Sequence, residues 1–143
     1  MSDPIAEMHA FNQGVIDEYR ATGGEVTGTF AGAPLLLLTT TGAKTGTART
    51  VPVVFGRDGD EIFVIASKAG APTNPAWYHN LLAHPRVTVE LGTETFEATA
   101  EVADPGLRDR LYAQQAAVMP GFAEYEEKTD RVIPVVLLRR TGS

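Results

Sequence analysis

The sequence contains no cysteine, and this absence excludes several kinds of chemistry at once. A chain without cysteine cannot form a disulfide framework, a cysteine-type zinc site or a thiol nucleophile. Long hydrophobic runs are absent as well, since no apolar stretch approaches the roughly 20 residues that a membrane-spanning helix needs. The first residues, MSDPIAEMHAF, lack the basic start and apolar centre of a signal peptide. We therefore expect a cytoplasmic protein.

Recognisable catalytic and metal-binding motifs are also missing from the sequence. The 3 histidines, His9, His79 and His84, do not have the spacing of metal ligands, and no His-Glu-x-x-His motif occurs. There is no Gly-x-Ser-x-Gly turn of the kind that presents a hydrolase serine. The Gly-x-Gly-x-x-Gly motif of a Rossmann dinucleotide site is absent too. We therefore expect a protein that binds no metal.

Positive charge is scarce, because 12 Lys and Arg face 18 Asp and Glu, for a net charge of −6. Such a balance argues against non-specific nucleic-acid binding, which depends on neutralising phosphates. The cations are unevenly distributed: between Val26 and Val89 there are 5 Lys and Arg against 3 acids, a charge of +2, whereas the rest of the chain carries −8. A basic middle in an acidic protein can be reserved for an anion. Chance clustering is the alternative that charge alone leaves open.

The pattern of apolar and turn residues predicts a single, mainly β (α+β) domain over residues 1–143. Helices are expected at 3–21 (within an N-terminal segment 1–24), 76–84, 104–118 and 122–128. Strands are expected at 34–42, 49–57, 62–67, 86–92, 95–103 and 131–140. The pairs Asp58-Gly59 and Gly92-Thr93 predict hairpin turns, so most of these six strands would be antiparallel. Short antiparallel strands with few helices indicate a small barrel or an α+β roll.

Further predictions concern the start of the second helix, the last strand and the apolar face of the first helix. Asn74 is expected to cap the second helix, with Pro75 at its first position. Pro134 limits the last strand to an edge, an end or a bulge, because proline cannot donate to a β-ladder. The apolar stripe of the first helix must be buried against the barrel, a partner or a membrane surface. Glu7 and Asp17 on that helix make an anionic membrane unfavourable.

The nine residues 42–50, GAKTGTART, combine two glycines with Lys44 and Arg49 and contain no acid. A glycine-rich turn lets backbone N–H groups converge on an anion, and the two cations add charge. The stretch is not a P-loop, because a strand rather than a helix follows it. It indicates a site for phosphate or carboxylate. A solvated hairpin tip is the alternative.

A second stretch, ASKAGAPTNPAWYHN at 66–80, has small residues against which a ligand can lie close to the backbone. Lys68 supplies another cation, and the start of the following helix offers its positive end to an anion. Taken alone, Trp77 is better explained as an ordinary core anchor than as a ligand contact. His79 alone is better explained as a surface or capped histidine.

In this order and at this spacing, the two stretches resemble the deazaflavin-dependent nitroreductase family of actinobacteria, over Leu35 to Leu138. The resemblance implies a split β-barrel over residues 35–139, like the FMN-binding split barrels. It implies the cofactor F420, an 8-hydroxy-5-deazaflavin whose tail carries a phosphate and a polyglutamate chain. Members of that family transfer a hydride to nitroimidazoles, quinones or activated double bonds in lactones such as coumarins and aflatoxins.

The resemblance also implies a set of cofactor-binding residues. They are Lys44, Thr45, Gly46, Arg49, Pro52, Val53, Ser67, Lys68, Gly70, Asn74, Pro75 and Trp77. Lys44 and Arg49 would hold the phosphate and tail, which explains why an acidic protein keeps cations on a glycine-rich turn. Pro52 and Val53 would line the pocket of the ring, with Trp77 packed beside it.

The implied acceptor pocket consists of Val54, Met119, Phe122 and Tyr125. The nitroimidazole-activating relatives carry several tyrosines in this region, and here only Tyr125 keeps a hydroxyl. A more apolar pocket is expected to favour flat conjugated lactones or quinones over nitroimidazoles. The proton donor is left open among Ser67, Tyr125 and water, so Ser67 and Tyr125 are the candidate catalytic residues.

Two other functions remain open at this point. One is a binding or carrier protein for F420 without significant turnover, and the other is an FMN-dependent reductase of the same fold. In each case the expected partner is a small molecule, with no nucleic acid and no stable membrane attachment, and the protein would be a monomer or homodimer. The N-terminal helix is expected to be dispensable for cofactor contact.

Overall fold

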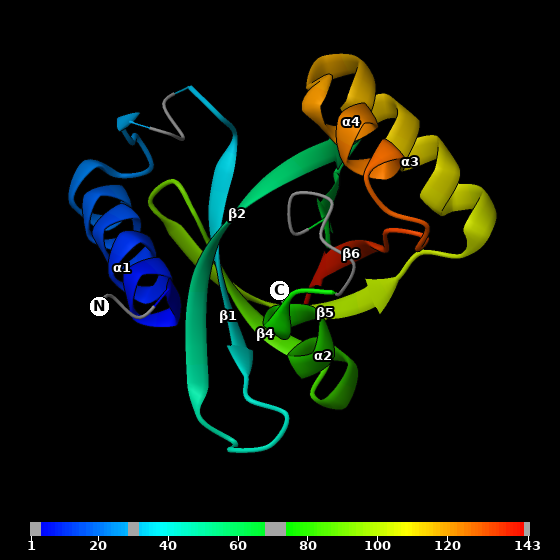
Figure 1. Ribbon diagram of the computed structural model, residues 1–143. Coiled ribbons are helices and arrows are strands. Elements are labelled where there is room, and N and C mark those ends of the chain that lie inside the picture. The colour runs from blue at the N-terminus through cyan, green and yellow to red at the C-terminus, as the bar shows by residue number, and fades with distance from the viewer. Residues whose placement is uncertain (1–3, 29–31, 68–73, 142–143) are drawn as a thin grey trace.

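Six antiparallel strands close into a barrel with the neighbour order β1-β2-β3-β6-β5-β4 in the computed structural model, which describes residues 4–28, 32–67 and 74–141 (Figure 1). The strands are β1 (Leu35–Thr41), β2 (Ala48–Asp58), β3 (Glu61–Ile65), β4 (Arg86–Leu91), β5 (Glu94–Val102) and β6 (Val135–Arg140). The helices are α1 (Pro4–Thr22), α2 (Ala76–Ala83), α3 (Pro105–Val118) and α4 (Gly121–Glu127). The predicted six-stranded split-barrel fold is confirmed.

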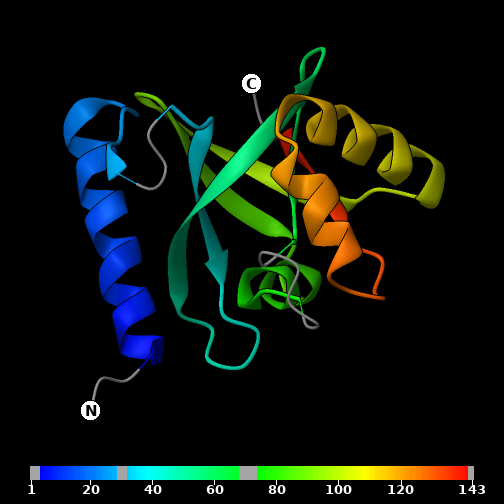
Figure 2. The same cartoon turned by 45° about the horizontal axis from the view of Figure 1, so that its top comes forward.

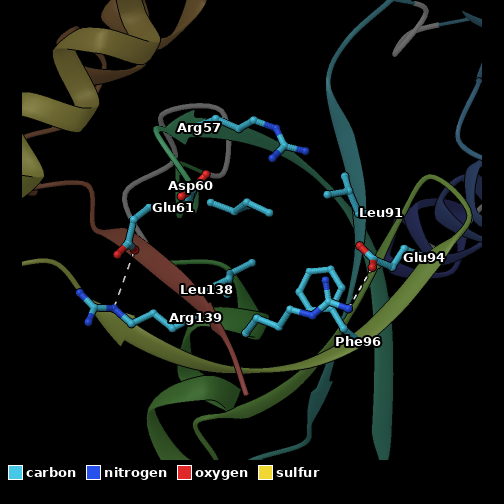
Figure 3. Close-up of a pocket in the computed structure, with 10 residues that line it drawn as sticks. Arg57, Asp60, Glu61, Leu91, Glu94, Phe96, Leu138 and Arg139 are labelled. Carbon is cyan, nitrogen blue, oxygen red and sulfur yellow. Dashed lines mark hydrogen bonds and ion pairs between the residues drawn. The ribbon is translucent and has the colours of Figure 1, made fainter. Parts of the chain in front are cut away.

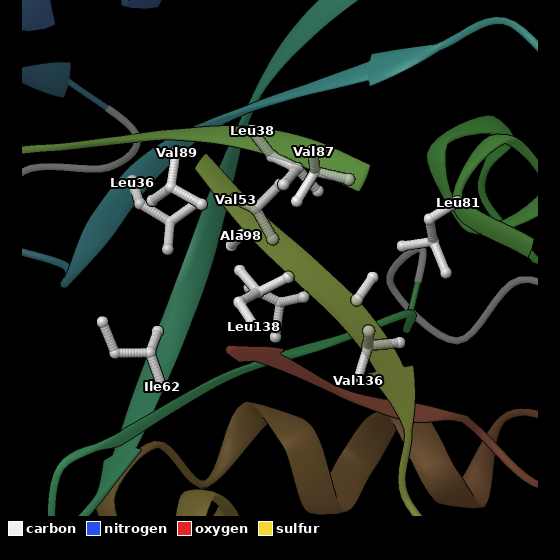
Figure 4. Packing of buried hydrophobic residues seen from close by; sticks show 12 residues of the cluster. Leu36, Leu38, Val53, Ile62, Leu81, Val87, Val89, Ala98, Val136 and Leu138 are labelled. Carbon is white, nitrogen blue, oxygen red and sulfur yellow. The ribbon is translucent and has the colours of Figure 1, made fainter. Parts of the chain in front are cut away.

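The barrel interior is filled by aliphatic side chains that alternate along each strand. Leu36 and Leu38 of β1 point inward and meet Val89 of β4 and Leu138 of β6 (Figure 4). The remaining leucines of β1, Leu35 and Leu37, lie on the outer face, where α1 covers them. Because both faces of β1 are buried, its sequence is a continuous apolar run rather than an alternating one.

Helices cover the outer face of the barrel on two sides, with α1 on one side and α3 and α4 on the other (Figures 1 and 2). α1 is fixed by the hydroxyl of Tyr19, which donates to the Leu35 carbonyl at 3.0 Å and accepts from the Gly92 N–H at 2.7 Å. Arg20 forms a two-pronged ion pair with Glu90 at 2.8–2.9 Å. The apolar stripe of α1 is therefore buried against the barrel.

α3 begins as predicted, because the carboxylate of Asp104 accepts a hydrogen bond from the Leu107 N–H at 2.9 Å. α3 and α4 then pack together through Tyr112, whose hydroxyl donates to the Phe122 carbonyl at 2.6 Å. Burial of the Tyr112 side chain raises its pKa to about 12. Desolvation in the same way raises the pKa of Tyr19.

Two predicted boundaries were wrong. The cap position of α2 is Pro75 and has no side-chain hydrogen bond, so Asn74 is not the cap. The last strand begins at Val135 instead of residue 131, because Pro134 cannot donate to the ladder. The Pro134 carbonyl still accepts from the Ala66 N–H at 2.9 Å, which continues the β3–β6 pairing by one bond.

Candidate functional site

The turn between β1 and β2 is compact and built around its glycines. The Gly42 N–H donates to the Thr47 carbonyl at 2.8 Å, and the Gly46 N–H donates to the Gly42 carbonyl at 2.9 Å. Gly46 has a φ of 71°, in the left-handed region that glycine adopts without steric cost. A side chain at Gly42 would collide with the hydroxyl of Thr45. The glycines thus fix the conformation of the turn.

α2 lies against this turn, and Asn80 makes the connection (Figures 1 and 2). Its side-chain oxygen accepts from the Ala43 N–H at 3.0 Å, and its side-chain nitrogen donates to the Thr40 hydroxyl at 3.1 Å. Thr40 is buried, so water competes little for the second bond. Asn80 thereby joins the two stretches that the sequence presents separately. No role was predicted for it, and its position within the second motif was the only available signal.

Lys44 and Arg49 lie on or beside this turn, and both are exposed. Among the described residues neither cation has a carboxylate partner. The arginines that do form ion pairs with carboxylates in the described residues are Arg20, Arg86, Arg108, Arg110, Arg139 and Arg140. The basic middle of the sequence does not form one patch, since Arg57 is eight residues from Arg49 along β2, roughly 26 Å at ~3.3 Å per residue. Lys44 and Arg49 are the cations that remain together at the α2 end.

A hollow of about 260 Å³ lies beside Arg49, between α1 and β2. Its walls are His9, Asn12, Gln13 and Ile16 from α1 and Arg49, Thr50 and Val51 from β2. α1 therefore lies closer to the predicted tail-binding residues than the sequence indicated. The side chains that α1 contributes here are mostly neutral and polar, so the charge of this hollow comes from Arg49.

β2 carries the two predicted ring-pocket residues on opposite faces. Val53 points into the barrel, where it packs with Leu36 and Leu38 (Figure 4). Outside the barrel, Val53 therefore offers its backbone to a ligand, and its place in the ring pocket stays a prediction. Pro52 and Val54 lie on the outer face, because side chains alternate along a strand, and Val54 packs against the outer apolar clusters.

The segment between β3 and α2 contributes Ser67, Asn74 and Pro75 among the described residues, and the first turn of α2 contributes Trp77. Lys68 and Gly70 lie outside the described residues. Pro75 is buried, and Ser67, Asn74 and Trp77 are partly exposed. Trp77 packs against the barrel core without being buried in it, so its ring has both a core contact and an accessible part. The side-chain hydroxyl of Ser67 has no hydrogen-bond partner within the described ranges.

The four predicted acceptor-pocket residues meet in one cluster on the outer face, between β2, α3 and α4. Phe122 belongs to its buried part, and Val54, Met119 and Tyr125 pack around it. Phe122 is only 6% exposed and contacts the rings of Tyr112 and Tyr125 edge-on at 6.2 and 5.5 Å. It therefore anchors α4 and exposes little of its side chain, and its predicted place in the substrate pocket stays a prediction.

Tyr125 keeps part of its side chain accessible, and its hydroxyl has no partner in the part of the chain that the structure describes. The ammonium group of Lys128 lies 5.9 Å from its ring centroid. Met119 is held by Gln115, whose amide nitrogen is 3.3 Å from the Met119 sulfur. The accessible surface of this cluster is thus apolar, with one hydroxyl that is free to donate a hydrogen bond.

A larger cavity, of about 420 Å³, lies at the opposite mouth of the barrel (Figure 3). Leu91, Phe96 and Leu138 line its floor, and charged side chains form its rim. Those charges largely neutralise one another, since Arg140 pairs with Glu94 at 2.9 Å and Arg139 lies 3.8 Å from Glu61. The rim carries three arginines and three carboxylates, so it has no net charge to attract an anionic ligand, and none of the predicted site residues lies there.

The chemistry of the α2 end fits an elongated anionic cofactor with a flat ring. Lys44 and Arg49 provide cations without acidic competition, and Pro52 and Trp77 provide apolar surface. No group of three or more His, Cys, Asp or Glu side chains suited to a metal ion is found in residues 4–28, 32–67 and 74–141. In those residues, no helix is long and apolar enough to cross a membrane.

Comparison with known proteins places this site in context. Residues 13–140 match the model of the F420H(2)-dependent quinone reductase family. An F420H(2)-dependent quinone reductase of Mycobacterium tuberculosis is 41% identical over 128 residues, covering 85% of each chain. The solved structure of an F420-H2 dependent reductase is 37% identical, with a TM-score of 0.68 over 74% of this chain and 94% of that one. A solved domain-swapped dimer is 33% identical, with a TM-score of 0.70 over 96% of this chain and 100% of that one. With its barrel, its cationic turn and these relatives, the chain belongs to the F420H(2)-dependent quinone reductase family.

Proposed function

We propose that this protein is a reductase that uses reduced F420 and acts on quinones and other flat conjugated acceptors, including lactones. The observation that carries the proposal is the pair of exposed cations, Lys44 and Arg49, which have no carboxylate partner among the described residues of a protein of net charge −6. Membership of a family described as F420H(2)-dependent quinone reductases supports the same cofactor and acceptor.

In this proposal, Lys44 and Arg49 hold the phosphate and tail of the cofactor through charge-assisted hydrogen bonds. Each such bond contributes roughly 1.5–3 kcal/mol. Thr45 and Gly46 shape the turn that presents these cations, and Asn80 keeps that turn against α2. Pro52 and Trp77 border the ring and limit its orientation. When bound, the reduced deazaflavin supplies the hydride.

The acceptor occupies the apolar outer face formed by Val54, Met119 and Tyr125. A planar conjugated ring can stack on such a surface and exclude water from it. The Tyr125 hydroxyl donates a hydrogen bond to a carbonyl of the acceptor and stabilises the charge that develops there during reduction. An apolar face with one hydrogen-bond donor suits a quinone or an unsaturated lactone better than it suits a nitro group, because a nitro group needs more hydrogen-bond donors.

The cofactor assignment is tested by titrating the purified protein with F420 and, separately, with FMN. We expect F420 to bind more tightly, because its longer anionic tail engages Arg49 and Lys68 as well as Lys44. Lys44→Ala should weaken F420 binding by about tenfold, equivalent to 1.4 kcal/mol, and added salt should reduce the difference. Arg57→Ala is the matched control, since Arg57 is another exposed arginine without a carboxylate partner in the described residues, at the other end of β2.

The outcomes separate the competing functions. Stoichiometric FMN retained through purification, with no response to F420, would identify a flavin enzyme. Tight F420 binding without turnover of quinones, lactones or nitroimidazoles would identify a carrier. Equal F420 affinities for the parent and Lys44→Ala would show that the cationic turn is not part of the cofactor site. Sedimentation analysis adds the oligomeric state, for which the domain-swapped relative suggests a homodimer.

A further inference from the structure

Arg131, which follows α4, reaches across to the segment that joins β3 and α2. Its guanidinium donates to the Asn74 side-chain oxygen at 2.7 Å and to the Ser67 carbonyl at 2.7 Å. A third bond, to the Ala66 carbonyl, is 3.2 Å long. Ala66 and Ser67 directly follow β3, whereas Asn74 lies just before α2. One side chain thus holds the two ends of this connection.

Arginine is suited to this arrangement by its shape. Its planar guanidinium presents several N–H donors in a fixed fork, so two separate chain segments can be bound by one rigid group. A lysine would bring a single point charge on a flexible stem and could not hold the same acceptors in one plane. Two of these three acceptors are backbone carbonyls and the third is the Asn74 amide oxygen, so Arg131 joins the end of one segment to the start of the next.

The base of the clamp is itself fixed. Ile133, two residues along, is fully buried, and its carbonyl accepts from Arg108 at 2.9 Å. Arg108 also binds Glu126 of α4 at 2.8 Å, so the chain that carries Arg131 is tied to α4 and α3 together. Movement of Arg131 relative to α4 is therefore restricted.

We propose that Arg131 is a positioning residue that fixes the position of the cofactor side of the site relative to the acceptor side. The inference rests on the proposed function, since Ser67 and Trp77 belong to the cofactor site and Tyr125 of α4 to the acceptor face. Arg131 holds Ser67 and the start of α2 to the chain that Arg108 anchors to α4. The distance over which a hydride transfers is short, so a small shift between these two sides lowers the rate more than it lowers either affinity.

The test compares Arg131→Gln, Arg131→Lys and Asn74→Ala with Arg110→Gln as a matched control. Arg110 is an exposed arginine of α3 that pairs with Asp58 and lies outside the site. We expect kcat/KM with reduced F420 and a quinone to fall on the order of 10²-fold in Arg131→Gln. The loss should be mostly in kcat. Lysine should restore little of it, and Asn74→Ala should lose about tenfold.

A second measurement does not depend on activity. Trp77 is the only tryptophan of the chain, so its fluorescence reports on the start of α2 alone. Quenching of Trp77 by acrylamide should increase in Arg131→Gln and in Asn74→Ala, at a temperature where both remain folded by circular dichroism, and should not change in Arg110→Gln. Combining the Arg131 and Asn74 changes should produce less than the sum of their separate effects, because they share one bond.

Unchanged quenching and unchanged kcat/KM in Arg131→Gln would overturn the proposal. So would a loss of activity that only follows the unfolded fraction, or a full rescue by lysine. If Arg131→Gln does not fold, Asn74→Ala decides, since it removes one of the bonds and keeps the arginine. If the parent protein shows no F420-dependent turnover, the proposed function fails, and the Trp77 measurement still tests the clamp.

Discussion

Single side chains decide how selective the acceptor face can be. Val54, Met119 and Tyr125 form its accessible part, and Phe122 supports them from the buried side. Only Tyr125 has a hydroxyl to offer, and that hydroxyl is not engaged by any residue that the structure describes. The chemistry of this face therefore depends on one hydrogen-bond donor set in apolar surroundings, where its contribution to a developing negative charge is large.

Tyr125→Phe is the residue-scale prediction. It should lower kcat for quinones and lactones by about tenfold or more and leave F420 affinity within about twofold, because the lost contact strengthens as charge develops. Steady-state kinetics with both acceptor classes and with bicyclic nitroimidazoles provide the measurement. Unchanged turnover in the variant, or faster reduction of nitroimidazoles by the parent, would show that this description of the acceptor face is wrong.

At the scale of elements, α1 acts first as a cover for β1. Its Tyr19 and Arg20 bind the backbone and side chains of neighbouring strands, and Ile16 packs on Leu35 and Leu37. One stretch of α1 also forms a wall of the hollow beside Arg49. The helix thus both covers β1 and lines the hollow beside Arg49.

The first role predicts that Tyr19→Phe destabilises the protein. The Leu35 carbonyl and Gly92 N–H would lose a buried partner, which costs about 1–3 kcal/mol. Denaturant unfolding measures this loss. F420 affinity should stay within about twofold in Tyr19→Phe and also in His9→Ala, since the arginine of the hollow, Arg49, comes from β2. A weakening in His9→Ala comparable to that of Lys44→Ala would make α1 part of the cofactor site.

For the whole molecule, two buried tyrosines predict how stability responds to alkaline pH. Burial raises the pKa of Tyr112 to about 12 and also raises the pKa of Tyr19. The folded state therefore favours the protonated phenols. Their contribution is complete below the ordinary tyrosine pKa of about 10 and is lost as the pH rises through the raised values. We expect the free energy of unfolding to fall between about pH 10 and 12.

Tyr112→Phe isolates this effect. The variant should be less stable than the parent at neutral pH by about 1 kcal/mol, because the Phe122 carbonyl loses its donor. It should also lose less stability than the parent between about pH 10 and 12. Urea unfolding at a series of pH values gives both quantities. Parallel curves for parent and variant would mean that Tyr112 does not titrate in this range.

Much of the fold could be predicted because it is encoded locally. The apolar run of β1, the Asp58-Gly59 and Gly92-Thr93 turns and the Asp104 cap act over a few residues, and their elements formed where predicted. One of the two wrong boundaries involves a distant partner. The Asn74 side chain accepts from Arg131, 57 residues away in the sequence, and so distant a partner leaves no local signal. The other, the start of the last strand, follows from Pro134 itself, which cannot donate to the ladder.

The sequence by itself determined the barrel's strands, the glycine-rich turn and the presence of cations in an acidic chain, since residue type and period act between neighbours. Tertiary structure alone decided which of those residues act together. Closure of the barrel turned Val53 inward and carried Arg57 to the far mouth, whereas Asn80 and Arg131 became the connections between segments distant in sequence. These positions and contacts depend on burial and hydrogen bonding between distant segments, because only the closed barrel brings the partners within reach.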